Sequence, residues 1–414
     1  MKKAAAVLFG SLYILLTAGV AVTAWIIANN ASCAAPEPME AAPFSSYEAS
    51  GTDVVPAAPS AYLLARLDEI SGRYGAVGVQ AAWLRGDALF TYEYGLADRS
   101  AGRRVAPDTK YRAASLSKLA ADLVFLCMEQ AGLVSRAQDI GVYLGYPVRN
   151  PAYPDVPITG EMLMLHTSSL QDSEAFLLSR NANSSVPLQT LLSRADSYRG
   201  AAPGDGHVYS NFGMAVLGAV CEKAANASFE TLAHRYLFAP LGIDAAFTAS
   251  HLARPELVGA LYGEGGCSLE TQFSAAFLPE LGQTHHLVQG NLTVSAQDYI
   301  RLLYPLLHGG MAANGVRLLT PENVKAIVSA HTYAGGEGIG YGLMLHENVL
   351  REGVQLIHTG SNFGMFSAFF ICPDTGEAVA VFTSGCARDP DPATGVYRVC
   401  LELARAVCGR KSVR

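Results

Sequence analysis

The chain has 414 residues, of which 50% are hydrophobic and 16% are charged. This composition supports a large packed core and excludes a disordered protein. The formal net charge is −7, and lysines and arginines cluster only near the two termini, so no sequence feature predicts a nucleic-acid-binding surface.

Residues 1–30 are the first predicted element. Lys2 and Lys3 precede an uncharged run at 4–28, and a helix over that run would be about 37 Å long, enough to cross a hydrocarbon core about 30 Å thick. The positive flank is expected to stay in the cytoplasm, which places the rest of the chain outside a cell membrane crossed once. The alternative is a signal segment that is cleaved, which would make the protein secreted.

Residues 31–60 are rich in alanine, proline and serine and show no apolar period, so we expect an extended linker. The main folded domain is expected at 61–410, with an inserted helical lobe at about 130–290. A short basic tail at 411–414 ends the chain.

The first elements expected in this domain are a helix and two strands, followed by a mostly helical region. Residues 60–75 have a serine cap and helical apolar spacing, and 76–98 predict two strands that turn at 85–87. From 115 to about 236 the signals are mostly helices and loops. Ser295 then opens another helix, with Asp298 at capping-box spacing.

Strand signals resume late in the chain. Residues 354–373 and 377–385 are rich in β-branched and aromatic side chains, and 393–409 close as a helix. Strands at both ends with helices between them predict an α+β fold. It consists of one antiparallel sheet flanked by the N- and C-terminal helices, plus the inserted, mostly helical lobe.

Eight cysteines occur in a chain that we expect to be exported, where disulfides are permitted. Most lie in apolar segments, among them Cys372, and are expected to be free, buried and inert. Cys400 and Cys408 fall on one helix, about 12 Å apart, too far to bridge each other. A bond between Cys386 and Cys400 stays open.

A serine and a lysine mark the start of the predicted helix after residue 112. Ser115 and Lys118 are one helical turn apart, so they share a face with about 5–6 Å between their Cβ atoms. A buried amine loses solvation of its charged form, which favours its use as a base for the hydroxyl. The helix N-terminus also favours negative charge on a substrate attacked there. A capping serine followed by a lysine that reaches solvent is the plain structural alternative.

Two later segments carry polar side chains suited to the same site. Tyr209 and Asn211 are two residues apart ahead of an apolar helix, so their side chains point the same way. His358, Thr359 and Gly360 lie on a predicted strand, where glycine lets a substrate backbone approach closely.

In the order Ser-x-x-Lys, Tyr-Ser-Asn, His-Thr-Gly, these motifs resemble the serine β-lactamase and penicillin-binding protein superfamily. The chain looks most similar to its class C β-lactamase branch, which includes D-Ala-D-Ala carboxypeptidases and esterases. "PDTKYRAASLSK", "LMLHTSSL", "LFAPLGI", "NLTVSAQD", "GYGLML" and "HTGSNFGMFS" carry that similarity.

The resemblance implies a role for each motif residue. Ser115 would form an acyl-enzyme, Lys118 would help to accept its proton, and Tyr209 would carry protons to the leaving group and from the deacylating water. Asn211 would bind the substrate amide or Lys118. The third motif would bind substrate through His358, Thr359, Gly360 and Ser361, with the backbone N–H groups of Ser115 and Ser361 as the oxyanion hole.

This resemblance implies no cofactor and no metal. His285 and His286, considered with Cys267 and His251, match no zinc-ligand spacing. His166 in "HTSSL" is expected to be structural, and Ser169 in that loop replaces a usual glycine.

His358 stands where true β-lactamases and carboxypeptidases usually have lysine. Histidine is mostly neutral at pH 7, so recognition of a substrate carboxylate is in doubt. The sequence therefore predicts an extracytoplasmic serine hydrolase acting on cell-wall D-amino-acid peptides, β-lactams or related amides and esters. The alternative from another class is a non-hydrolytic receptor for muropeptides or antibiotics.

Overall fold

The computed structural model describes residues 54–408, apart from 182–185, 274–280 and 283–286. The predicted membrane segment at 1–30 and the tail at 411–414 lie outside these residues, as do His285 and His286. None of the helices described combines the length and the apolar character that a membrane crossing needs. The predicted linker includes Val55–Ala57, which form strand β1, so folded structure is already present before residue 61.

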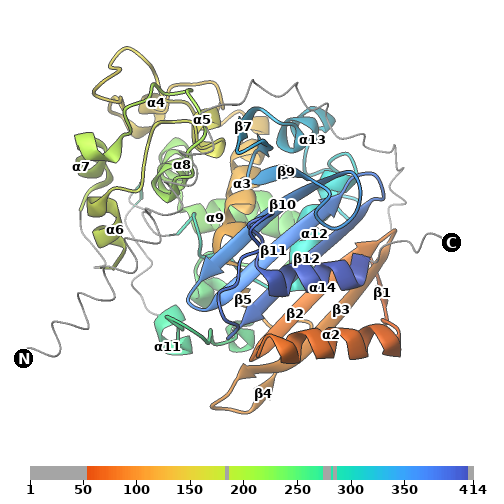
Figure 1. Cartoon of the computed structure of the whole chain (residues 1–414). Coiled ribbons are helices and arrows are strands. Elements are labelled where there is room, and N and C mark those ends of the chain that lie inside the picture. Colours follow the sequence, from red (N-terminus) through yellow and green to blue (C-terminus); the bar gives the residue numbers. More distant parts are fainter. Residues whose placement is uncertain (1–53, 182–185, 274–280, 283–286, 409–414) are drawn as a thin grey trace, which may run out of the picture.

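A ten-stranded sheet dominates the described part of the chain (Figure 1). Its order is β1-β3-β2-β12-β11-β10-β9-β8-β7, with β4 beside β3, and every pair except β1 with β3 is antiparallel. Because β12 pairs with β2, the two ends of the domain meet in mid-sheet, as the sequence predicts. The remaining strands are β2 (Gly78–Arg85), β3 (Ala88–Asp98), β4 (Arg103–Arg104), β7 (Thr332–Ala334), β8 (Glu337–Gly340), β9 (Leu343–Glu347), β10 (Val354–Asn362), β11 (Met365–Cys372) and β12 (Glu377–Ser384).

Helices cover both faces of the sheet. On one face, α2 (Ala61–Arg73) and α14 (Arg398–Cys408) pack against each other and share an apolar core with the sheet (Figure 1). The opposite face carries α3 (Ser117–Gln130) and α12 (Ala296–Leu307) within the larger core. With apolar partners on both sides, β11 and β12 need long apolar runs.

The caps expected from the sequence are present at two of these helices. The Ser60 hydroxyl accepts from Leu63 N at 3.2 Å, and the Ser295 hydroxyl accepts from Asp298 N at 3.2 Å. Each bond satisfies one of the N–H groups that a helix start leaves without an intrahelical partner.

The other helices gather mostly beside the sheet, and α4 to α8 form a group at one side of it (Figure 1). Helix α8 of this group contacts α3, so the motif segments at the starts of both helices lie close together. The α+β fold class is confirmed. A second, two-stranded sheet joins β5 (Tyr111–Arg112) to β6 (Thr293–Val294). The helices not yet given are α4 (Gly141–Leu144), α5 (Gly160–Met164), α6 (Glu174–Asn181), α7 (Leu188–Leu192), α8 (Asn211–Ala225), α9 (Phe229–Ala233), α10 (Ala239–Leu241), α11 (Leu269–Gln272) and α13 (Pro321–Val328).

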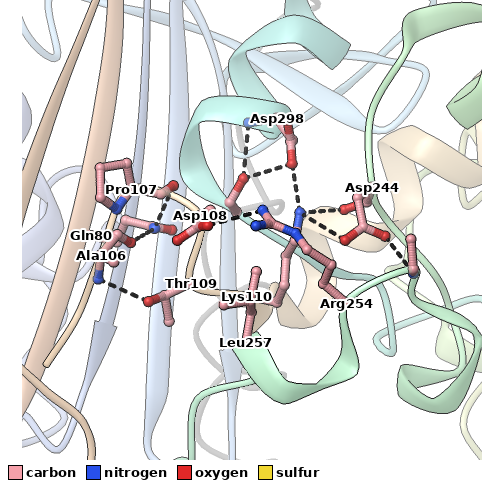
Figure 2. A network of polar contacts seen from close by, with 12 residues as sticks. Gln80, Ala106, Pro107, Asp108, Thr109, Lys110, Asp244, Arg254, Leu257 and Asp298 are labelled. Carbon is pink, nitrogen blue, oxygen red and sulfur yellow. Dashed lines mark hydrogen bonds and ion pairs between the residues drawn. The ribbon is translucent and has the colours of Figure 1, made fainter. Parts of the chain in front are cut away.

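A buried polar network fixes the segment that leads into β5 and Ser115 (Figure 2). Lys110, 1% exposed, donates from Nζ to Asp298 Oδ2 at 2.7 Å and to the Asp244 carbonyl at 2.6 Å. Gln80 on β2 donates to the Ala106 carbonyl at 2.7 Å and accepts from Ala296 N at 2.7 Å. These bonds connect the segment to β2 and to the start of α12.

Replacing Lys110 with methionine should lower the free energy of unfolding by about 1–3 kcal/mol, because Asp298 loses its ammonium partner and keeps only the longer ion pair with Arg301. Urea unfolding of the full chain measures the change. Arg66→Met is the control, since Arg66 pairs with Glu69 on an exposed helix face and should hardly affect stability. Equal effects of the two variants would contradict a structural role for the buried pair.

Candidate active site

Ser115 lies in a short 3-10 turn, Ala114–Leu116, directly ahead of α3. Ala114 has φ +52°, a left-handed conformation that costs on the order of 1 kcal/mol for a residue other than glycine. Ser117 holds the turn: its hydroxyl donates to the Ala114 carbonyl at 2.6 Å and accepts from Leu292 N at 2.9 Å. Ser115 remains partly exposed between buried neighbours, so a substrate can reach its hydroxyl.

Lys118 connects the first motif to the second. Its side chain is fully buried, and Nζ lies 3.3 Å from Ser115 Oγ, 3.0 Å from Asn211 Oδ1 and 2.7 Å from the Gln289 carbonyl oxygen. A lysine that only reached past a capping serine to solvent would make none of these contacts. The structure therefore excludes the plain structural alternative for this pair.

Tyr209 and Asn211 enter the same site from the start of α8. Tyr209 is 41% exposed, and its ring centroid lies 4.7 Å from Lys118 Nζ. Asn211 is oriented by Asp172, whose Oδ2 accepts from Asn211 Nδ2 at 2.7 Å and whose Oδ1 accepts from Phe212 N at 2.9 Å. With its amide nitrogen on Asp172, Asn211 presents its oxygen to Lys118.

The third motif lies on β10, next to the nucleophile turn. A Cβ atom added to Gly360 would come 2.7 Å from the Ala113 carbonyl oxygen and 2.3 Å from Ser367 Oγ. Glycine is thus required because the chain ahead of Ser115 packs against β10. The sequence alone predicts a different reason for this glycine, the close approach of a substrate backbone.

The other third-motif residues lie on both faces of β10. Thr359 and Ser361 are two apart on β10, so they lie on one face of the strand, and both are at least partly exposed. His358 is 8% exposed and points to the other face, with its ring 6.4 Å from that of Tyr209.

His358 is a neutral side chain in this site. Burial is the main cause that lowers its pKa, to about 4. Its Nδ1 lies 2.7 Å from the Thr359 carbonyl oxygen, which can only accept, so Nδ1 carries the proton and Nε2 is left as an acceptor. This position provides no cation at neutral pH.

His166 positions the second motif. Its Nδ1 accepts from Ser210 N at 3.2 Å, and its ring packs 4.7 Å from that of Tyr209. Burial lowers the pKa of His166 well below its usual value, so the ring is a neutral acceptor. Ser169, in the same loop, has φ +64°, which explains why glycine is usual there.

Three groups around the motifs were missed by the sequence reasoning. Asp172 orients Asn211, and the Gln289 carbonyl binds Lys118. Asp122 follows Lys118 by one helical turn, is fully buried, and has no hydrogen-bond partner for either carboxyl oxygen among the described residues. Burial raises the pKa of Asp122 well above its usual value, which favours the neutral acid.

The sequence carried a signal for only some of these groups. Asp122 is an acidic residue within the apolar run of α3, which marks it as unusual. A backbone carbonyl such as that of Gln289 leaves no mark in a sequence. Across the ranges that the structure describes, no cluster of histidine, cysteine or acidic side chains is arranged to hold a metal ion.

Comparison with known proteins agrees with this arrangement. The Beta-lactamase family model matches residues 63–400. Penicillin-binding protein 4 of Amycolatopsis lactamdurans is 24% identical over 332 residues, covering 77% of this chain and 84% of that protein. Esterase EstB of Burkholderia gladioli is 30% identical over 237 residues, which cover 50% of this chain and 56% of the esterase.

Solved structures show the same fold. A class C beta-lactamase superposes with a TM-score of 0.66 at 17% identity, over 84% of this chain and 98% of that one. The superfamily expected from the three motifs is confirmed. On the family match and on the fold, the chain belongs to the Beta-lactamase family and is a serine hydrolase.

Proposed function

We propose that the protein hydrolyses amides and esters through an acyl-enzyme on Ser115. The observation that carries the proposal is the contact between a reachable hydroxyl and the fully buried amine of Lys118, 3.3 Å apart. Ser115 Oγ attacks the substrate carbonyl, and its proton passes to the Lys118 and Tyr209 pair. The backbone N–H groups of Ser115 and Ser361 stabilise the oxyanion.

Tyr209 completes the cycle in this proposal. Its ring contacts Lys118 and is open to solvent, so the phenol can give a proton to the leaving amine or alcohol. It then takes a proton from the water that attacks the acyl-enzyme, which releases the acid and restores Ser115. Asn211, fixed by Asp172, keeps Lys118 in place.

We propose that the preferred substrates are amides and esters that carry no charge beside the scissile bond. A neutral His358 with a lone pair on Nε2 does not attract a carboxylate, whereas a lysine at this position would. Cell-wall D-amino-acid peptides with a free carboxylate and β-lactams are then the poorer substrates of the site. A non-hydrolytic receptor has no observation in its favour.

The experiment compares acetyl-D-Ala-D-Ala with its C-terminal amide. We expect a higher kcat/KM for the amide, and His358→Lys should shift the ratio toward the free carboxylate by about tenfold, the value of one favourable charge interaction. His358→Gln is the neutral control and should leave the ratio unchanged. A wild-type preference for the carboxylate would contradict the substrate assignment. Binding without product would favour the receptor.

We also propose that the catalytic domain works outside the cytoplasm, either anchored by residues 1–30 or released after their cleavage. The apolar run behind Lys2 and Lys3 supports this. N-terminal sequencing of the mature protein separates the two forms. A cytoplasmic full-length protein in cell fractionation would contradict both.

A further inference from the structure

An aromatic side chain lies exposed at the turn between β10 and β11. Asn362 pairs with Met365 in the ladder, which leaves a turn of two residues, Phe363 and Gly364. Phe363 has φ +52° and Gly364 has φ +74°, the left-handed pair that a type I′ hairpin needs. Asparagine or aspartate is usual at the first of these positions, because a bulky side chain is strained there. The turn itself therefore does not explain the phenylalanine.

A series of contacts connects this ring to the catalytic lysine. The Gln289 carbonyl oxygen lies 2.7 Å from Lys118 Nζ. The next carbonyl, that of Gly290, accepts from Arg112 Nε at 3.1 Å. The guanidinium carbon of Arg112 lies 4.8 Å from the centroid of the Phe363 ring. The segment that holds Lys118 thus also holds the arginine on which the ring rests, which places the ring at the edge of the candidate active site.

The ring lies at the end of β10 that is away from Tyr209. Thr359, Ser361 and Phe363 are two residues apart from each other, so they continue along one side of the chain. His358, whose ring is 6.4 Å from that of Tyr209, comes five residues earlier, about 17 Å along an extended chain. In the proposed reaction Tyr209 protonates the leaving group. The acyl chain, on the other side of the carbonyl carbon, then points toward Phe363.

Gly290 leaves room beside this end of the site. A Cβ atom added to Gly290 would have only one atom of the described residues within 4 Å, the carbonyl carbon of Ala114 at 4.0 Å. Gly290 is partly exposed, and its φ lies outside the left-handed region, so the backbone does not require glycine. The missing side chain therefore leaves open space next to the turn that carries Ser115.

We propose that Phe363 and Gly290 form a subsite for an apolar acyl substituent, in which the ring selects aryl and arylacetyl groups over acetyl. This inference rests on the proposed acyl-enzyme function and defines the acyl side of its substrates. Phe363 is 36% exposed, so an aryl group can pack on its ring while Arg112 supports the ring from the protein side. Backbone strain of this kind is typical of positions that contact a ligand.

The test measures kcat/KM of the full-length protein for p-nitrophenyl phenylacetate and p-nitrophenyl acetate. The wild type should favour the phenylacetate. Phe363→Asn should lower the ratio of the two values by about tenfold, the scale for losing a small apolar contact with a substrate. Its Tm should stay within about 3 °C of the wild type, because asparagine suits the turn and offsets the lost contact with Arg112. Gly290→Val should lower the same ratio by filling the open space.

Tyr62→Asn is the matched control, because Tyr62 is an aromatic residue, 84% exposed, on the helix α2 that covers the other face of the sheet. It should leave the ratio unchanged. An unchanged ratio in Phe363→Asn or in Gly290→Val, or a wild-type preference for the acetate, would overturn the subsite and leave the acyl-enzyme on Ser115 standing. If the wild type hydrolysed neither ester, the subsite and the proposed function would both fail.

Discussion

Ser115→Ala is expected to lower kcat/KM for an activated ester by about 10⁴-fold or more, the scale seen when a nucleophile is removed from a catalytic unit. Ser115 Oγ is the only atom lost from the site, and Lys118 keeps its bonds to Asn211 and Gln289. The fold should therefore be unchanged. Hydrolysis rates and labelling with a fluorescent phosphonate measure the loss.

Ser117→Ala is the matched control, two residues along the same turn. The Ser117 hydroxyl bonds the Ala114 carbonyl and Leu292 N, so its loss should reduce stability by about 1–2 kcal/mol while the nucleophile can still be labelled. Labelling that survives in Ser115→Ala, or disappears only in Ser117→Ala, would remove Ser115 from the reaction.

Lys118→Met is expected to lower kcat/KM by about 10³-fold, within the range for loss of a positioned proton acceptor. The change also leaves Asn211 Oδ1 and the Gln289 carbonyl without this donor, at a cost of about 1–3 kcal/mol in stability. Activity and urea unfolding should be measured on the same preparation, because only the activity loss is specific to catalysis.

Lys110→Met is the matched control for Lys118→Met, since both lysines are buried. Lys110 pairs with Asp298, so its loss should act on stability, and the folded variant should retain activity. A Lys118→Met enzyme that stays within tenfold of the wild type would contradict the role of Lys118 as proton acceptor.

The sheet and its flanking helices were predictable because their signals are local. The caps at Ser60 and Ser295 and the turn at 85–87 mark where elements begin or reverse. The pairing of β12 with β2 follows once strands are expected at both ends of the domain. The short strand β1 was missed, because three residues carry too little pattern to stand out from a linker.

The candidate site was predictable only as far as side chains form motifs. Ser115 and Lys118 share a helix face, and the structure brings Tyr209, Asn211 and His358 to them. Features that arise when distant segments pack together left no local mark: the left-handed Ala114, the Gln289 carbonyl, and the contact of Gly360 with the nucleophile turn.

The burial of the cysteines was predictable from their neighbours along the chain. Cys127, Cys221 and Cys372 lie in apolar segments, and each of them is free and buried, as the sequence predicts.

Mass spectrometry of the intact protein, quenched during turnover of an amide or ester, tests the central claim most directly. A covalent acyl-enzyme predicts a mass increase equal to the acyl group less the one hydrogen that it replaces, located on the peptide that contains Ser115 and missing in Ser115→Ala. An adduct on a different residue would contradict the account. So would turnover that forms no adduct and that continues at the full rate in Ser115→Ala.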